Sequence, residues 1–170
     1  MKHYIIIILL TLVALIATSC KKDPVITNRY LMWPERFPKQ IVNELNMFMN
    51  EAAKRNVNIE LDKYVTRFVV GGKNTVAGAD AAGYYDYDLK FIYIDTTSIL
   101  YLQGKEFLIF HELGHGVLHR NHENGYFIDG WPISIMNESS PRLGPQDQYR
   151  RQYYVDELFN IYTPTPYWEK

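Results

Sequence analysis

The stretch that decides the fold is FLIFHELGHGVLHRNH, residues 107–122. Its apolar residues lie on nearly every side of a helical wheel, and such a helix belongs in a protein interior. Two histidines and a glutamate fall inside it, and burying them would cost free energy unless a metal ion or hydrogen bonds compensate them. We therefore predict a central helix that builds both the core and a functional site. It should run from Ser98 or Gly104 to Arg120.

Residues 111–115, His-Glu-Leu-Gly-His, place two imidazoles one helical turn apart. Because a helix turns about 100° per residue, His111 and His115 share a face and can both reach one Zn²⁺ at about 2.0–2.1 Å. Glu112 lies about 100° around the helix, beside the metal, where its carboxylate can take a proton from a zinc-bound water. The pattern predicts a zinc site with Glu112 as its general base.

A catalytic zinc site needs a third protein ligand. If the helix continued, His122 would lie about 16 Å along the axis from His111, which two imidazoles cannot span. The helix must therefore end first. Arg120-Asn121 is a suitable end, because Asn tolerates the left-handed conformation of a C-terminal cap. His122 is then the first side chain able to fold back, and His119 remains a competing ligand.

Several acidic residues are further metal-ligand candidates. As third ligands of a glutamate-type zinc site, the candidates are Glu123, Glu138 and Glu157. Glu157 is the best placed of these, on the predicted last helix, although Asp156-Glu157 is more typical of a solvated face. An acidic, tyrosine-rich loop also offers oxygen ligands for calcium, although such loops are usually just soluble. Its three carboxylates are Asp80, Asp86 and Asp88.

The sequence on either side of the central helix predicts an α+β fold. Apolar residues recur at spacings of three and four from 38 to 55, which indicates an amphipathic helix that stops near Asn56. β-branched and aromatic residues predict strands at 64–70 and 89–95, the second half-buried, with a return strand at 75–77. Residues 78–88 and 124–145 predict loops, and 146–162 a final helix. We expect one compact domain: a small mixed sheet with an N-terminal helix, a central active-site helix and a C-terminal helix.

The N-terminus predicts export. Lys2 precedes an apolar run over residues 4–17, which is short for a bilayer-spanning helix of about 20 residues, so residues 1–19 are typical of a signal peptide. The sequence Ala-Thr-Ser-Cys at 17–20 resembles the lipobox of bacterial lipoproteins, in which the signal is cut before an acylated cysteine. This resemblance implies a protein anchored through Cys20 to the bacterial outer membrane, on its periplasmic or cell-surface face. Residues 20–30 would be the lipidated tether and 31–170 the domain.

Composition excludes several classes of protein. The chain has 170 residues, and the part beyond the signal suffices for one domain with a sizeable core. Eighteen Lys and Arg against 19 Asp and Glu exclude a strongly basic nucleic-acid-binding protein, so we expect no nucleic-acid partner. Cys20 is the single cysteine, so no internal disulfide can form. The fold must depend on its core and on a metal.

The run from His111 to His122, followed by Ser-Ile-Met-Asn at 134–137, resembles the metzincin zinc metallopeptidases, particularly matrixin-like members. Their pattern is H-E-x-x-H-x-x-G-x-x-H followed by a methionine-containing turn beneath the metal. The run is also similar to small lipoprotein members of this group with a spacing one residue longer. Here the third histidine comes eleven residues after the first instead of ten, and Leu118 stands where the family has glycine.

The resemblance implies His111, His115 and His122 as the zinc ligands, Glu112 as the general acid and base, and Met136 as a hydrophobic floor. For Met136, the role of an ordinary core methionine is equally open. The resemblance further implies a compact metzincin-like domain that hydrolyses peptide bonds of a protein or peptide substrate with Zn²⁺ as cofactor. We expect it to act as a monomer.

Two other functions remain open at this point. A zinc hydrolase acting on something other than peptides would use the same helix, since the motif specifies only an activated water. A surface-binding lipoprotein with a purely structural metal is the second alternative. Glu112 argues against it, because a closed structural site needs no adjacent base. A fourth protein ligand, such as His119, would favour it.

Overall fold

A computed structural model describes residues 37–72, 81–138 and 148–169. They form a mixed α+β domain, which confirms the predicted fold class. The predicted signal, Cys20, its tether and the predicted return strand at 75–77 lie outside the described residues. In the part of the chain that is described, no helix combines the length and apolar character needed to cross a membrane.

The sheet has three strands, β1 (Arg67–Gly71), β2 (Gly83–Asp86) and β3 (Phe91–Asp95), in the order β1-β3-β2. β3 pairs in parallel with β1 and antiparallel with β2, so the sheet is mixed, as predicted. Strand β2 corrects the prediction of a loop at 78–88. The Gly and Asp residues of that segment suggested a loop, but Tyr84 and Tyr85 pair with β3. β2 forms an edge of the described sheet.

All five residues of β3 are buried, whereas its alternating pattern predicted a half-buried strand. Ile92 and Ile94 belong to the main core. The ring of Tyr84 lies against the rings of Phe91 and Tyr93, with centroids 5.6 and 5.7 Å apart. The Tyr84 side chain from the neighbouring strand therefore helps to shield the second face of β3, which the pattern of β3 alone cannot show.

Helix α2 (Val42–Lys54) follows a 3-10 turn at Lys39–Ile41 and confirms the predicted N-terminal helix. It buries Leu45, Phe48 and Ala52. Asn56 ends it as predicted: this residue has a φ of 58°, the left-handed conformation of a helix C-terminus. A short helix α3 (Leu61–Tyr64) then leads into β1.

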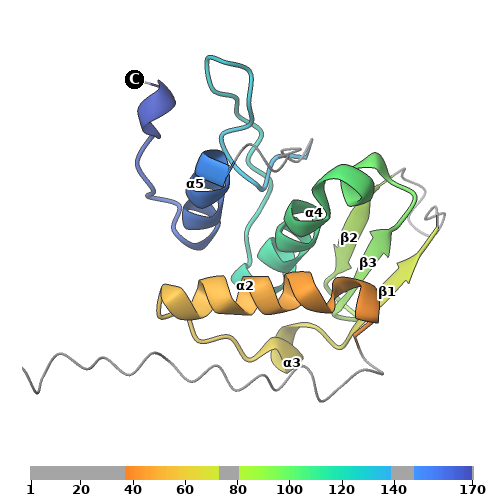
Figure 1. The fold of residues 1–170 in the computed structure, drawn as a ribbon. Coiled ribbons are helices and arrows are strands. Elements are labelled where there is room, and N and C mark those ends of the chain that lie inside the picture. The colour runs from red at the N-terminus through yellow and green to blue at the C-terminus, as the bar shows by residue number, and fades with distance from the viewer. Residues whose placement is uncertain (1–36, 73–80, 139–147, 170) are drawn as a thin grey trace, which may run out of the picture.

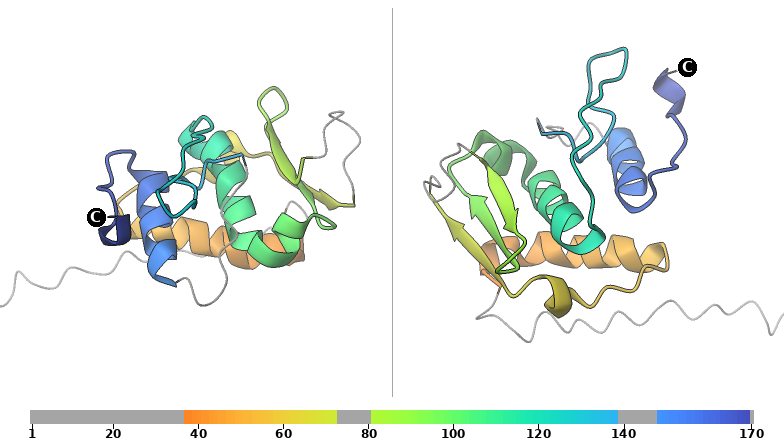
Figure 2. Two further views of the ribbon diagram at one scale, coloured as in Figure 1. Left: turned by 90° about the horizontal axis from the view of Figure 1, so that it is seen from above. Right: turned by 180° about the vertical axis from the view of Figure 1, so that it is seen from behind.

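Helix α4 (Ile99–Leu118) is the centre of the domain. Figures 1 and 2 show it between the sheet and α5 (Gln148–Phe159), with α2 running across one end of all three. The helix starts one residue after Ser98 and is kinked at Gly104, where φ is −142° and ψ is 36°. Its apolar side chains are buried as predicted, namely Phe107, Leu108, Ile109, Phe110, Leu113 and Val117.

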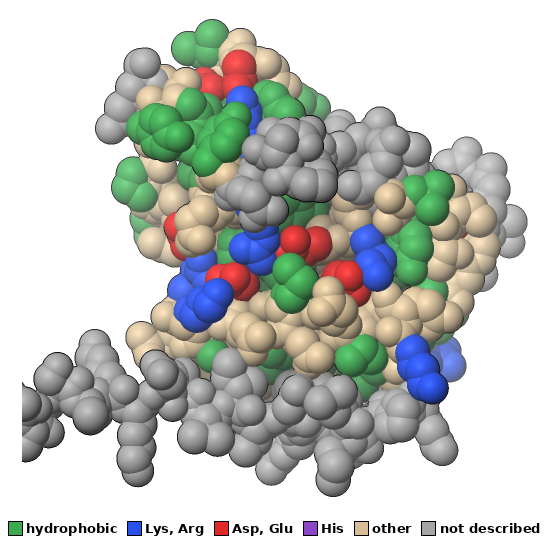
Figure 3. Space-filling view, viewed as in Figure 1, with side chains coloured by type: hydrophobic (Ala, Val, Ile, Leu, Met, Phe, Trp, Pro, Cys, Tyr) green, Lys and Arg blue, Asp and Glu red, His purple; other side chains and the backbone are tan. Residues whose placement is uncertain are grey.

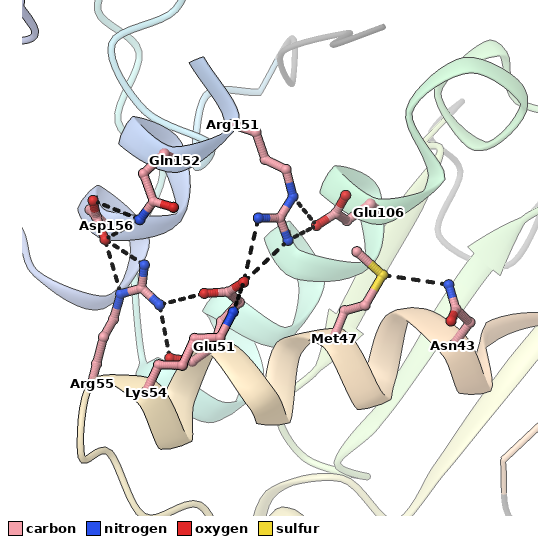
Figure 4. A network of polar contacts seen from close by, with 9 residues as sticks. All are labelled: Asn43, Met47, Glu51, Lys54, Arg55, Glu106, Arg151, Gln152 and Asp156. Carbon is pink, nitrogen blue, oxygen red and sulfur yellow. Dashed lines mark hydrogen bonds and ion pairs between the residues drawn. The ribbon is translucent and has the colours of Figure 1, made fainter. Parts of the chain in front are cut away.

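Ion pairs join the three long helices where they meet. Glu51 of α2, which is 6% exposed, pairs with Arg55 at 2.7 Å and with Arg151 of α5 at 3.4 Å. Arg151 also pairs with Glu106 of α4 at 2.5 Å. Figure 4 shows this network, and Figure 3 shows acidic and basic side chains alternating across one face of the molecule. The network fixes α5 against α4, the helix on which the functional site is built.

Candidate metal centre

Three imidazoles converge at the C-terminal half of α4: His111 and His115 from the helix, and His122 from the segment after it. Their Nε2 atoms are 3.0 Å (His111 to His115), 3.1 Å (His115 to His122) and 3.3 Å (His111 to His122) apart. Two nitrogens bound tetrahedrally to one metal at about 2.05 Å would be about 3.3 Å apart. The side chains of this three-histidine group therefore lie close enough to bind a metal ion.

The contacts of the Nδ1 atoms indicate which nitrogen of each ring carries the hydrogen. His111 Nδ1 lies 2.9 Å from the carbonyl oxygen of Ile135, and His115 Nδ1 lies 2.7 Å from that of Arg120. Because a carbonyl oxygen only accepts, both Nδ1 atoms carry the hydrogen, and the Nε2 atoms of neutral rings present lone pairs. Lone pairs that face each other at 3.0 Å repel unless a cation lies between them. The donor set fits a metal ion better than a hydrogen-bonded pair of histidines.

Burial keeps these rings neutral. Burial, with a smaller contribution from the neighbouring His115 and His122, lowers the pKa of His111 to about 4. Burial also lowers the pKa of His115. A neutral imidazole is the form that binds a metal, so both rings are ready to act as ligands at neutral pH.

The chain turns back toward this group because α4 ends at Leu118. His119 has a φ of 55°, the left-handed conformation that commonly ends helices. The prediction that Asn121 caps the helix is therefore wrong by two residues. The earlier turn brings the carbonyl of Arg120 to within 2.7 Å of His115 Nδ1, a contact that a helix continued to Asn121 would not allow.

His119 lies away from the converging rings. Its own ring packs edge-on against that of Tyr64, with centroids 5.4 Å apart. The group of side chains able to share a metal includes His122 and leaves His119 out. The structure thus separates two candidates between which the sequence could not decide.

Glu112 lies beside the three-histidine group in a position shielded from water. Its side chain is buried, and burial raises the pKa of its carboxyl to about 8. Oε2 has no hydrogen-bond partner among the residues that the structure describes. An unpartnered buried oxygen is costly, which favours a polar ligand in front of it. In its ionised form, a carboxyl with a raised pKa is a stronger proton acceptor.

Gly83 of the edge strand β2 makes room for this carboxyl. A methyl group at Gly83 would come within 2.7 Å of Glu112 Oε1 and within 3.0 Å of its Cδ. Any larger residue at this position would have to push the carboxyl aside. Sequence reasoning missed Gly83, because the segment was predicted to be a loop with no neighbour across a sheet.

An open cleft of about 390 Å³ gives access to the three-histidine group and to Glu112. Its other wall comes from β2 and the residues next to it, and Asn121 lines the helix side. The wall residues were missed as site residues, although the strand propensity of tyrosine was an available signal. They are Ala81, Gly83, Tyr84, Tyr85 and Tyr87.

Residues 134–137 support the site from the core side. The carbonyl of Ile135 holds His111, and Met136 is fully buried. A Cβ on Gly114 of α4 would come within 2.5 Å of Met136 Sδ, so this glycine lets the loop approach the helix closely. Met136 is thus placed beneath the helix that carries both histidines, as part of the main core.

Glu157 of α5 contacts both segments whose backbone carbonyls hold the imidazoles. Glu157 Oε1 accepts a hydrogen bond from Arg120 at 2.5 Å, and Oε2 accepts one from Ser134 at 2.8 Å. Arg120 provides the carbonyl for His115, and Ser134 directly precedes the residue that holds His111. The prediction of a solvent-exposed position is wrong for Glu157. This residue is only 5% exposed, because Arg120 and Ser134 enclose its carboxylate.

The remaining acidic candidates stand apart from the three Nε2 atoms. Glu123 pairs with Arg120 at 3.2 Å, and Glu138 lies on the far side of His122, next to Nδ1. Of the candidate calcium ligands, Asp80 lies outside the described residues, and Asp86 accepts the backbone N–H of Leu89 at 2.7 Å. Within the described ranges, the three-histidine group is the one cluster found that could hold a metal.

Comparison of the chain with models of known protein families, with curated proteins and with solved structures found no match. The geometry of the site combines three imidazole nitrogens close enough to share a metal ion, a buried carboxyl with a raised pKa beside them, and an open cleft that both line.

Proposed function

We propose that the protein is a zinc-dependent metallopeptidase. His111, His115 and His122 hold one Zn²⁺, and Glu112 is the general base. The observation that carries this proposal is the buried, unpartnered Glu112 carboxyl beside three imidazoles in an open cleft. Three imidazole ligands with a fourth position left open are characteristic of catalytic zinc, whereas a structural site is closed by four protein ligands.

Each part of the site has a role in peptide hydrolysis. Zn²⁺, when bound, lowers the pKa of a water molecule and polarises the carbonyl group of the substrate. Glu112, in its carboxylate form, would accept the proton of the attacking water and pass it to the leaving amine. The Ile135 and Arg120 carbonyls keep the lone pairs of His111 and His115 aimed at the metal.

The end of α4 supports the resemblance to the metzincin pattern. That pattern has a glycine three residues after its second histidine, and its third histidine three residues after the glycine. Here the left-handed His119 comes four residues after His115, and His122 comes three residues after His119. A helix that is one residue longer accounts for both departures, Leu118 in place of glycine and the longer histidine spacing.

The alternative of a purely structural metal has less support. Its candidate for a fourth ligand was His119, and the ring of that residue packs against Tyr64 instead. The location of the enzyme is proposed from sequence alone: an exported protein anchored through Cys20, with residues 20–30 as its tether, acting as a monomer on protein or peptide substrates. Such an enzyme would act at the bacterial outer membrane.

The zinc-loaded full chain is expected to cleave members of a mixed peptide library, with the new termini identified by mass spectrometry. A chelator should abolish cleavage, and stoichiometric Zn²⁺ should restore it, because the activated water depends on the metal. Cleavage that survives complete removal of the metal would contradict the proposal. So would a zinc-loaded chain that hydrolyses simple esters but no peptide, since that result would identify a hydrolase of another class.

A further inference from the structure

The third imidazole has a different kind of partner from the first two. Backbone carbonyls hold Nδ1 of His111 and His115, whereas Nδ1 of His122 lies 3.3 Å from the side-chain oxygen Oε1 of Glu138. Nε2 of the same His122 ring points to the other two histidines, at 3.1 and 3.3 Å. Glu138 therefore contacts the His122 ring at Nδ1, the nitrogen that does not face the other two histidines.

Several hydrogen bonds hold Glu138 opposite His122. The backbone N–H of Glu138 donates to Oδ1 of Asn124 at 3.0 Å, and the N–H of Glu123 donates to the carbonyl of Met136 at 3.1 Å. The side chain of Asn137 donates to the carbonyl of Gly125 at 3.2 Å. Residues 123–125 and 136–138 are thus joined side by side, and the first of these segments comes immediately after His122.

We infer that Glu138 is a positioning residue of the metal centre: its carboxylate accepts the Nδ1 hydrogen of His122 and thereby aims Nε2 at the metal. A carboxylate behind a ligating imidazole fixes the tautomer and strengthens the nitrogen as a donor. His122 needs this help most, because it comes from a loop and its side chain is 43% exposed. The inference rests on the proposed zinc site.

The contact between Glu138 and His122 should affect metal affinity and have little effect on the stability of the fold. The Glu138 side chain is 63% exposed, and exposed ion pairs contribute little to folding. Partners of this kind typically change metal affinity by about 10–100-fold when they are removed. A substitution at Glu138 can therefore be tested in a protein that still folds.

The test measures the zinc dissociation constant of the full chain by competition with a chelator of known affinity. Glu138→Ala should weaken zinc binding by about 10–100-fold, and Glu138→Gln by less, because the amide oxygen can still accept a hydrogen bond. The matched control is Glu123→Ala. Glu123 is also exposed and comes directly after His122, but it pairs with Arg120, so its removal takes away the same charge without touching the imidazole.

Two further measurements distinguish a positioning role of Glu138 from a general effect of removing a negative charge. The visible absorption spectrum of the Co²⁺-loaded protein should shift in Glu138→Ala and stay unchanged in Glu123→Ala, because only the first removes the partner of a ligating imidazole. Thermal unfolding of the metal-free proteins should differ little between the variants, because both carboxylates are exposed. Equal losses of zinc affinity in Glu138→Ala and Glu123→Ala would overturn the inference, as would an unchanged affinity in Glu138→Ala. Failure of the unmodified chain to bind zinc would instead overturn the proposed zinc site itself.

Discussion

Glu112→Gln is expected to lower kcat/KM for peptide cleavage by about 10²–10⁴-fold, the usual contribution of a general base, while bound zinc stays the same. Glutamine has the same size as glutamate and fits the space left by Gly83, but its amide cannot accept the proton of the attacking water. Glu112 lies beside the three-histidine group and is not a member of it, so the metal should remain. Kinetics and zinc content are measured on the same sample.

Gly83→Ala is the complementary variant, because it keeps the Glu112 carboxylate but moves it out of position. The added methyl would meet Glu112 Oε1 at 2.7 Å, so the carboxyl must move away from its position. Activity should fall while zinc content is again unchanged. A Glu112→Gln protein that retains zinc and more than about a tenth of the activity would contradict the role of Glu112. Loss of zinc in that variant would show that Glu112 is itself a ligand.

Glu157→Ala is expected to reduce the free energy of unfolding by about 3–5 kcal/mol, the usual cost of removing one partner from a buried ion pair. The substitution leaves the guanidinium of Arg120, whose side chain is 11% exposed, without its closest carboxylate. It also removes the acceptor of the fully buried Ser134 hydroxyl. Urea unfolding of the metal-free protein gives the difference directly.

Glu123→Ala is the control for this comparison, because Glu123 pairs with the same Arg120 from an exposed position. Its side chain is 48% exposed, and the expected loss is at most about 1 kcal/mol. Similar losses of unfolding free energy in Glu157→Ala and Glu123→Ala would show that the buried ion pair contributes no more to stability than the exposed one. The buried pair would then not be what holds α5 against the metal centre.

The parts of the fold that local sequence patterns determine were predictable. The apolar spacing of α2, its end at Asn56 and the all-round apolar character of α4 each depend on residues within one element. Strand β2 was missed, because its glycine and aspartate favour a loop and only pairing with β3 makes it a strand. The complete burial of β3 was missed for the same reason.

The candidate site likewise contains residues that the sequence could predict and residues that it could not. Helical spacing alone places His111, Glu112 and His115 together, because all three lie on one element. The sequence favoured His122 as the third ligand but could not exclude His119, since the choice between them depends on where the helix ends. The roles of Gly83 and Glu157 could not be predicted, because each acts through a contact between segments distant in the chain.

The most direct test of the proposed metal centre is the zinc content and zinc affinity of His122→Asn beside those of His119→Asn. Both substitutions remove one imidazole from adjacent parts of the chain, and Asn tolerates the left-handed backbone at position 119. We predict one zinc per chain in the unmodified protein and in His119→Asn, and a loss of tight zinc binding in His122→Asn. Loss of zinc from His119→Asn with retention in His122→Asn would contradict His122 as the third ligand.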